Sequence, residues 1–321
     1  MSELFLRHNG GEKNVDSQEK RFAVYTVITG GFDGVKQPLV IDDRFDYILF
    51  TDKHIEEVGV WSVKLIDFDS PDLRLKSRFP KLCSHLCLGE YEASLYIDGT
   101  IQITSQYVYD RCIELYESGI EWAGMKHQAR NYMIDEINAI IGLAWVHDYE
   151  VIDWYKFLKI ENFKDDLGLF ENNIIYRRHT DNVKNVNNIW WWSIEKYRFR
   201  RDQFSLMYVL SKVPEIKIGY FLPPGQTAWE NDGHFLYTYH NPHKRDLKRT
   251  AWEIARNRCA RVCFKNKNKE YGIFTDMFDN VIKYKHYHLA MHCWTLYVII
   301  RYGYIVIYEM IKLRHQLWTK K

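Results

Sequence analysis

The first hundred residues contain four short apolar runs, rich in β-branched and aromatic residues, that each end at or near glycine or aspartate. They are RFAVYTVITGG from residue 21, FDYILFTD at 45–52, WSVKLID at 61–67 and SLYID at 94–98. Runs of this length and composition, closed by turn residues, predict β-strands. Between the third and fourth runs, residues 70–91 place leucine and phenylalanine at helical spacing. This order predicts an α/β domain with a largely parallel sheet.

The same kind of pattern continues to about residue 240. We expect helices near 106–118, 131–143, 185–198 and 202–213, and strands at 121–127 and 168–179. A polar, aromatic stretch runs from 143 to about 167. The hydrophobic content of 46% is ample for a packed core. The sequence therefore predicts a polar N-terminal segment at 1–20, one domain at 21–243 and a helical C-terminal extension at 244–321.

The charges are unevenly distributed along the chain. Of its 44 Lys and Arg and 42 Asp and Glu, 17 basic but only 6 acidic residues lie in 244–321, so the body is acidic and the tail basic. An acidic body argues against a nucleic-acid partner, which would need a basic groove. A basic tail suits an anionic membrane surface. The N-terminus lacks the apolar core of a signal peptide, so we expect a cytoplasmic protein, peripheral on the inner face of the membrane.

The six cysteines include no Cys-x-x-Cys pair. Cys83 and Cys87, like Cys259 and Cys263, are spaced as neighbours on a helix. Thiols at such positions are common in reduced cores, and a zinc site built from the two pairs is the alternative.

Asp98 closes the apolar run SLYI and is followed by Gly99. In an open α/β sheet, ligands bind outside the carboxyl ends of the strands. A carboxylate there can hold a divalent cation that neutralises a diphosphate. Asp-Gly is also a strong turn pair, and this short stretch alone does not decide between a site residue and a turn.

The segments around Asp98 resemble a glycosyltransferase-like family long described as domain of unknown function 616. In that family a helix with the pattern Arg-x-x-x-Arg-x-x-Lys-x-x-x-His precedes a strand that ends in Asp. The matching residues are Arg74, Arg78, Lys81, His85 and Asp98. The segment KHQARNYMIDEI is similar to a second family block and supplies His127, Arg130 and Glu136, with Gln128 where the family has proline. A third block, from IIYRRH to RRDQFSLMYVL, supplies His179, Trp191, Trp192, Arg201, Asp202 and Gln203.

The resemblance implies a GT-A-like domain of Rossmann type that transfers a sugar from a nucleotide-sugar donor to a saccharide or glycolipid acceptor. It assigns donor binding to Arg74, Arg78, Lys81, His85 and Asp98. It assigns sugar or acceptor binding to His127, Arg130, Glu136, Trp191, Trp192 and Arg201. Asp202, beside Gln203, is the expected catalytic carboxylate, either as a base or as a stabiliser of the oxocarbenium-like sugar. The alternative role of Asp202 is to cap the following helix.

The expected cofactor is a divalent cation, Mn or Mg, at Asp98. GT-A enzymes ordinarily carry Asp-x-Asp at the strand end, whereas this chain has Asp-Gly-Thr, so metal dependence is open. His240 or His243 is either a further metal ligand or a bystander in a loop. His127 and Arg130 fit a buried pair equally well, and at least one of the three consecutive tryptophans belongs to the core.

The expected function is a glycosyltransferase that extends a surface glycan of the capsule or lipopolysaccharide type. The alternative is a non-catalytic glycan- or nucleotide-binding module of the same fold, and both retaining and inverting chemistry fit. Near the C-terminus, Leu296, Ile300 and Ile307 share an apolar helical face with Ile299, Tyr304 and Ile311, while Arg301 and Glu309 interrupt the apolar run. This pattern favours a helix lying in the membrane interface, and core helices packed on the domain are the alternative.

Overall fold

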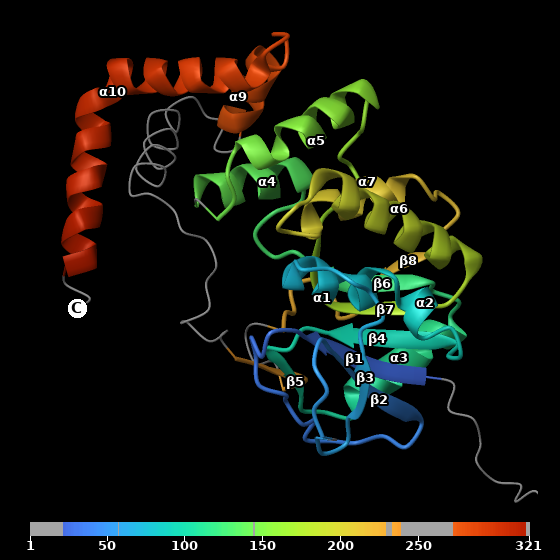
Figure 1. Cartoon of the computed structure of the whole chain (residues 1–321). Helices are drawn as coiled ribbons and strands as arrows, with labels where there is room; N and C mark the ends of the chain where they lie inside the picture. The colour runs from blue at the N-terminus through green and yellow to red at the C-terminus, as the bar shows by residue number, and fades with distance from the viewer. Residues whose placement is uncertain (1–21, 57, 144, 229–232, 239–271, 319–321) are drawn as a thin grey trace, which may run out of the picture.

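A seven-stranded mixed sheet forms the centre of the fold (Figure 1). The computed structural model describes residues 22–56, 58–143, 145–228, 233–238 and 272–318. The strands are β1 (Phe22–Ile28), β2 (Phe45–Thr51), β3 (Ser62–Leu65), β4 (Ala93–Ile97), β6 (Trp122–Lys126), β7 (Phe170–Arg178) and β8 (Ile218–Tyr220). Their order is β3-β2-β1-β4-β7-β6-β8, and β7 alone runs antiparallel to its neighbours. The predicted α/β domain with a mixed, mostly parallel sheet is confirmed.

Helices cover both faces of the sheet. They are α1 (Leu73–Leu82), α2 (Ser84–Cys87), α3 (Tyr107–Glu117), α4 (Met133–Gly142), α5 (Tyr149–Ile160), α6 (Asp181–Tyr197), α7 (Gln203–Ser211), α9 (Gly272–Val281) and α10 (Tyr287–Trp318). Because side chains alternate along a strand, Tyr25 of β1 enters the core beneath α1, α6 and α7, whereas Val24 enters the core on the α3 side. A small antiparallel pair, β5 (Ile101–Ile103) with β9 (Phe235–Tyr237), belongs to the α3 side.

The helix predicted over 70–91 is broken in two at Cys83. Arg177 of β7 is fully buried, and its guanidinium donates to the backbone oxygen of Lys81 at 2.5 Å and to Ser84 Oγ at 2.9 Å. These bonds hold the break between α1 and α2 open, and they come from a distant strand. Two further differences concern whole elements: α5 lies in the polar, aromatic stretch for which no element was predicted, and β8 and β9 lie outside the expected strands.

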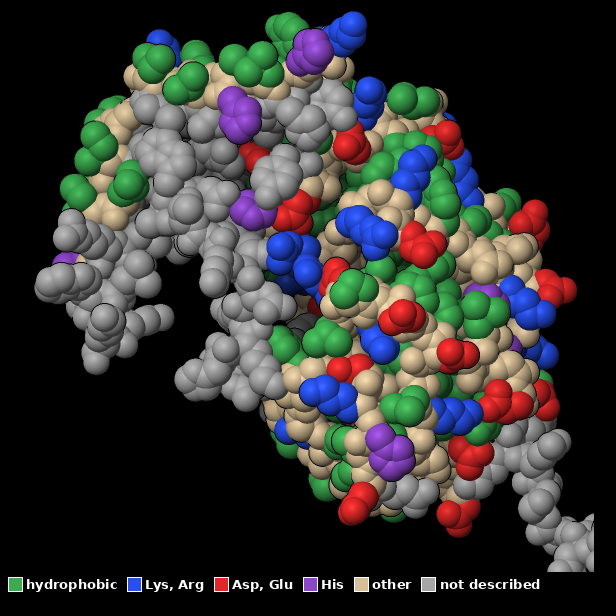
Figure 2. All heavy atoms as spheres, in the orientation of Figure 1, with side chains coloured by type: hydrophobic (Ala, Val, Ile, Leu, Met, Phe, Trp, Pro, Cys, Tyr) green, Lys and Arg blue, Asp and Glu red, His purple; other side chains and the backbone are tan. Residues whose placement is uncertain are grey.

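The two C-terminal helices behave differently. Met277, Phe278 and Val281 of α9 are buried in the main core, and Tyr155 of α5 donates its hydroxyl to Asp279 at 3.1 Å. Large apolar side chains of α10 are instead exposed: Leu289, Leu296, Tyr297, Ile300, Tyr304, Ile307, Tyr308 and Ile311. Hydrophobic side chains follow the outer surface of this helix in Figure 2. No helix in the described part of the chain has the length and apolar character needed to span a bilayer.

Candidate active site

The carboxyl ends of β1, β4 and β6 lie at one edge of the sheet, and β7, being antiparallel, begins there. β1 has β2 on one side and β4 on the other, so the order of the strands reverses between β1 and β4. Open α/β sheets bind ligands at such a reversal. Asp98 follows β4 at this point, and its N–H donates to the backbone oxygen of Asn173 at 2.8 Å.

Four charged side chains, Arg78, Lys81, Asp98 and Asp202, form a cluster at this edge. The Nζ of Lys81 lies 2.9 Å from Oδ2 of Asp202 and 3.4 Å from Oδ1 of Asp98. Nε of Arg78 lies 3.4 Å from the same Asp202 oxygen. Lys81 and Asp202 are only 3% and 5% exposed, whereas Asp98 and Arg78 reach the surface. The structure thus brings together residues from α1, the end of β4 and the start of α7.

The Asp202 side chain faces this cluster and not the helix that follows it. Asp202 precedes α7, but its carboxylate makes no capping hydrogen bond. Asn172 Nδ2 donates to Oδ1 of Asp202 at 3.3 Å, and Trp190 Nε1 donates to the Asp202 backbone oxygen at 2.9 Å. Gln203 donates to the backbone oxygen of Phe170 at 2.7 Å, which ties the start of α7 to β7. The carboxylate is therefore placed by contacts from β7, α6 and α1.

The surroundings fix the protonation of this cluster. Burial acts to raise the pKa of Asp202, but the charges of Arg78 and Lys81 outweigh it and hold that pKa well below its usual range. Burial, with the Asp98 charge, raises the pKa of Tyr96 well above its ordinary value, and the Tyr96 hydroxyl donates to Asp98 at 2.5 Å. Asp202 is consequently an anion at neutral pH. A carboxylate with so low a pKa stabilises positive charge and is a weak base.

A second charged cluster surrounds Glu136 of α4. Nε of Arg130 lies 2.9 Å from Oε2 of Glu136, and Nε2 of His127 lies 3.4 Å from it. Nδ1 of His127 accepts from the backbone N–H groups of Ala129 and Arg130, which leaves Nε2 to carry the proton toward Glu136. Burial acts to raise the pKa of Glu136, but His127 and Arg130 together lower it. The second sequence block therefore forms one local unit.

Arg201 connects the two clusters. Its burial lowers its pKa, while Glu136 and Asp202 both act on it in the opposite direction through their charges. The centre of its guanidinium lies 4.7 Å from the centroid of the Trp145 ring. The charge of Arg201 thus interacts with both carboxylates and adds positive charge to this part of the molecule.

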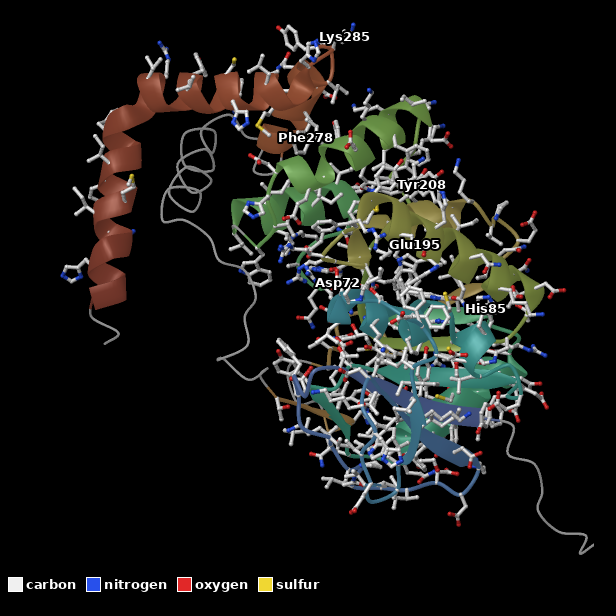
Figure 3. The ribbon with its side chains drawn as sticks, viewed as in Figure 1. Asp72, His85, Glu195, Tyr208, Phe278 and Lys285 are labelled. Atoms are coloured by element: carbon white, nitrogen blue, oxygen red, sulfur yellow. The ribbon has the colours of Figure 1, made fainter. Side chains whose placement is uncertain are left out.

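Three of the predicted residues lie elsewhere. His85 belongs to α2, where its Nδ1 lies 3.2 Å from Asn187 Nδ2 of α6, and Figure 3 shows it at the far end of the α1–α2 layer from Asp72. Trp191 packs edge-on against Phe68 and Phe79 in the core. Trp192 is partly exposed and lies over Lys196. His240 and His243 fall outside the described residues.

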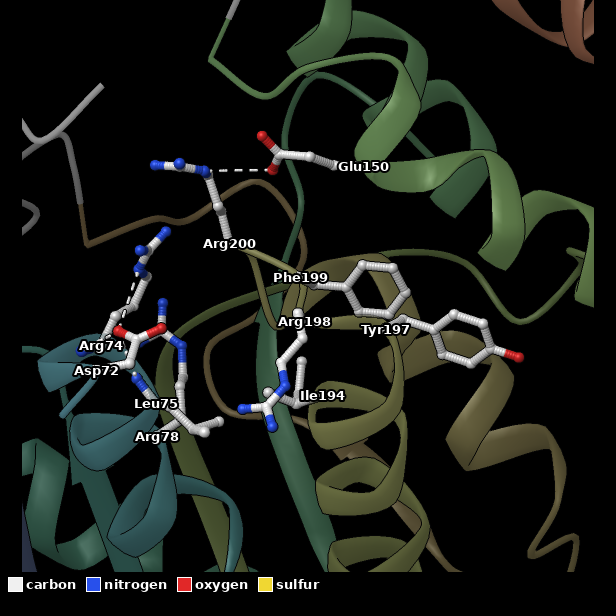
Figure 4. A pocket seen from close by; sticks show the side chains of 10 residues that line it. All are labelled: Asp72, Arg74, Leu75, Arg78, Glu150, Ile194, Tyr197, Arg198, Phe199 and Arg200. Carbon is white, nitrogen blue, oxygen red and sulfur yellow. Dashed lines mark hydrogen bonds and ion pairs between the residues drawn. The ribbon is translucent and has the colours of Figure 1, made fainter. Parts of the chain in front are cut away.

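Two cavities flank the Arg78–Asp202–Lys81–Asp98 cluster. The first, of about 310 Å³, lies beside Gly99 and is lined by Gly31, Phe32, Asp33, Gly34, Lys36, Gly99 and Thr238. A Cβ on Gly99 would stand 3.2 Å from Cγ1 of Ile28, a tight approach, and 3.4 Å from Oδ2 of Asp33. The second, of about 300 Å³, contains Arg78 and is lined by Asp72, Arg74, Leu75, Arg78, Glu150, Ile194, Tyr197, Arg198, Phe199 and Arg200 (Figure 4).

The described residues do not by themselves fit a divalent cation at Asp98. No three His, Cys, Asp or Glu side chains in the described ranges converge as metal ligands. The Lys81 ammonium lies within 3.4 Å of both cluster carboxylates, where it would repel a metal ion. The Lys81 ammonium thus places a positive charge beside Asp98, where the sequence suggested a metal ion.

Three neighbours of the site were missed from the sequence. Tyr96 stands two residues before Asp98. Because side chains two apart on a strand share a face, the sequence could have predicted that Tyr96 lies beside Asp98. Asn172 and Asn173 are buried amides at the start of β7, each with a side-chain oxygen that lacks a hydrogen-bond partner among the described residues. Buried polar residues in a strand are a sequence signal for a site.

Comparison with solved structures finds distant similarities. Core-mannan synthase A from Aspergillus fumigatus, solved in its Mn/GDP form, matches 65% of this chain over 74% of its own, at 11% identity and a TM-score of 0.37. Mouse xyloside xylosyltransferase 1, apo form, matches 62% of this chain over 84% of its own, at 9% identity and a TM-score of 0.33. Likenesses this distant bear on neither substrate nor mechanism. No curated protein sequence matches the chain.

The family comparison covers the part of the chain that forms the site. Residues 12–223 match the model of the TOD1/MUCI70 glycosyltransferase-like domain, and this range includes both charged clusters and all seven strands of the main sheet. The match confirms the glycosyltransferase-like resemblance of the three sequence blocks. The chain therefore belongs to the TOD1/MUCI70 family of glycosyltransferase-like domains.

Proposed function

We propose that the protein is a glycosyltransferase that moves a sugar from a nucleotide-sugar donor to a saccharide acceptor at the Arg78–Asp202–Lys81–Asp98 cluster. The observation that carries the proposal is the buried, ionised Asp202 carboxylate, held by two cations beside Asp98 where the strand order reverses. Glycosyl transfer requires a carboxylate near the sugar, which gains positive charge, and cations near the departing diphosphate. Both kinds of charge are present within one cluster.

The accessibility of each charged side chain suggests whether it contacts a substrate or holds the site in place. Arg78, with 23% of its side chain exposed, can contact a substrate directly, whereas buried Lys81 keeps Asp98 and Asp202 fixed. Arg201 adds further positive charge from the side of Glu136. Because its pKa is low, Asp202 acts by stabilising the oxocarbenium-like sugar and not by taking a proton. The His127, Arg130 and Glu136 unit and the amide of Gln203 are then positioned to orient sugar hydroxyls.

The donor nucleotide fits the cavity beside Gly99. This cavity lies at the strand reversal, opens between the loop after β1 and the end of β4, and adjoins Asp98. A nucleotide there would place its diphosphate next to the cluster. We include a Mn or Mg ion as a variable of the test, because the donor's own phosphates can supply ligands that the described residues lack.

The test is turnover with a panel of nucleotide-sugars, with and without manganese, for the wild type and for Asp202→Asn. We expect the wild type to transfer or slowly hydrolyse one donor and Asp202→Asn to lose about 10²-fold or more in kcat with donor affinity little changed. Asp181→Asn, an exposed aspartate on α6, is the matched control and should retain full turnover. Donor binding without turnover in the wild type would favour the alternative, a non-catalytic module.

The acceptor and the location of the protein form a finer part of the proposal. The exposed apolar side chains of α10 and the basic character of 244–321 support attachment to an anionic membrane surface. A glycosyltransferase attached there could extend a lipid-linked surface glycan of the capsule or lipopolysaccharide type. The protein would then act as a peripheral membrane enzyme on the cytoplasmic side.

A further inference from the structure

The cavity that contains Arg78 is unusually rich in arginine. Four guanidinium groups and two carboxylates line it: Arg74, Arg78, Arg198, Arg200, Asp72 and Glu150. Arg74 and Arg78 come from α1, whereas Arg198 and Arg200 follow α6, so two distant segments supply cations to one cavity (Figure 4). Leu75, Ile194 and Phe199 form its apolar part. An apolar wall strengthens the attraction between these cations and an anion.

Three of the four arginines of the cavity have a carboxylate nearby. Nε of Arg200 lies 3.2 Å from Oε2 of Glu150, and Nε of Arg78 lies 3.4 Å from Oδ2 of Asp202. The Arg74 guanidinium lies 3.9 Å from Asp72, whose Oδ1 also accepts the N–H groups of Arg74 and Leu75 as the N-cap of α1. Arg198 has no carboxylate partner among the described residues, so the cavity keeps one cation that is not paired within them.

Arg198 is the arginine of this cavity whose side chain has no partner among the described residues. Its guanidinium makes no hydrogen bond or ion pair with any residue in the described ranges, although its backbone N–H closes the last turn of α6. Its φ of 55° is left-handed, a conformation that costs an ordinary side chain about 1 kcal/mol and that glycine or asparagine adopts more easily. An arginine held in this conformation at a cavity wall points to a role for its charge.

We propose that this cavity, which we call the arginine pocket, binds a phosphate group carried by the acceptor. A phosphate monoester carries close to two negative charges at neutral pH, so Arg198 and the neighbouring arginines attract it more strongly than they attract a singly charged group. Guanidinium groups bind its oxygens in pairs. The identification of the bearer as the acceptor rests on the proposed function, because Arg78 joins the pocket directly to Asp202.

The position of the pocket separates this phosphate from the donor's diphosphate. The arginine pocket and the cavity beside Gly99 share no lining residue, and the charged cluster lies between them. A nucleotide in one and a phosphorylated saccharide in the other would meet at Asp202. Arg74, which the sequence pattern grouped with the donor residues, lies on the acceptor side in this arrangement.

The experiment measures binding by calorimetry for the full chain and for Arg198→Asn, which suits the left-handed backbone and so preserves the fold. The probes are glucose 6-phosphate, glucose, glucuronate and a nucleoside diphosphate. We expect glucose 6-phosphate to bind the wild type, to bind more weakly as salt rises, and to lose about ten-fold in affinity in Arg198→Asn. The nucleoside diphosphate should bind both proteins equally. Arg178→Gln, which removes an arginine that lies over the Tyr116 ring, is the charge-matched control and should change nothing.

Four results would overturn the proposal, and the first three concern the phosphate probe. They are failure of glucose 6-phosphate to bind the wild type better than glucose, equal binding by wild type and Arg198→Asn, and binding of glucuronate at least as tight as that of the phosphate. A parallel loss of nucleoside diphosphate affinity in Arg198→Asn would assign the pocket to the donor and also overturn it. Loss of turnover across the donor panel, with phosphate binding intact, would instead contradict only the glycosyltransferase function.

Discussion

Buried charges at the site edge are the main feature at the residue scale. Lys81 contacts two carboxylates from different segments, and Arg177 fixes the Lys81 backbone from the opposite direction. A buried ion of this kind is strongly destabilising when its partner is removed, because the remaining charge stays out of water. The cluster is therefore coupled to the folding of the domain, and tests of activity need a matching test of stability.

Asp98→Asn separates the two interpretations of the strand-end motif. Asp98 is about one-third exposed, so we expect the fold to lose only about 1 kcal/mol while turnover falls by about 10² or more, because an amide balances the Lys81 ammonium poorly. Urea unfolding and donor turnover are the two measurements. Turnover close to that of the wild type in a folded Asp98→Asn protein would leave Asp98 as a turn residue only.

His179 predicts a dependence of stability on pH. Burial, assisted by the charge of Arg177, lowers the pKa of His179 to about 4, against about 6.5 for an unfolded histidine. Between these values the unfolded chain binds the extra proton, so the free energy of unfolding falls as pH drops from about 6.5 to 4. We expect His179→Gln to remove about 2 kcal/mol of this fall in denaturant titrations at each pH. If the free energy of unfolding falls equally with pH in His179→Gln and in the exposed control His54→Gln, His179 is not the cause of the fall.

At the element scale, α5 is a helix that was not predicted although the sequence contains its signal. Val151, Ile152, Trp154, Tyr155 and Leu158 are buried where α5 packs against α6 and α9, whereas Asp153 and Lys156 are exposed. Val151, Trp154, Tyr155 and Leu158 stand at the i, i+3, i+4 and i+7 spacing of an amphipathic helix, so local periodicity could have predicted it. The C-terminal helix α9 accordingly belongs to the same core as the site-bearing helices.

Phe278→Ala tests whether α9 is part of the domain. The Phe278 side chain is fully buried, and its ring centroid lies 5.2 Å from that of Tyr155. We expect the substitution to lower the free energy of unfolding by about 3 kcal/mol or more, since it leaves a cavity in the core. Tyr284→Ala, at an exposed position just after α9, is the control and should change it by less than about 0.5 kcal/mol. A small effect at Phe278 would make α9 a dispensable appendage.

At the scale of the whole molecule, an acidic body is joined to a basic tail whose long helix exposes an apolar surface. Exposed apolar side chains follow the outer side of α10 (Figure 2), whereas Ala290 and Trp294 near its start pack against the main core. An exposed apolar surface of this kind marks an interaction site. Because α9 is buried in the core, removal of the whole extension would damage the domain, whereas deletion of α10 alone removes only the partly buried contacts of Ala290 and Trp294.

A chain that ends at His286 isolates the contribution of α10. We expect the full chain to bind vesicles that contain anionic lipid, with affinity that weakens as salt rises, and the shortened chain to lose this binding while it keeps its fold. Sedimentation with the vesicles measures it. Ile300→Glu should reproduce most of the loss, whereas Ile160→Glu, at an exposed isoleucine of α5, should not. A full chain that ignores anionic vesicles at low salt would contradict the membrane proposal.

The sequence by itself determined the α/β class, six of the seven strands of the main sheet and the family, because strands and helices are encoded in local periodicity and the family blocks are contiguous. It also singled out Asp98 and Asp202 as residues, but not their contacts. Only the tertiary structure decided that Lys81 joins them, that the antiparallel β7 brings Asn172 to the same edge, and that α1 and α6 share a pocket of arginines. Contacts of this kind depend on strand order and helix packing across the whole domain, and no local pattern in the chain specifies them.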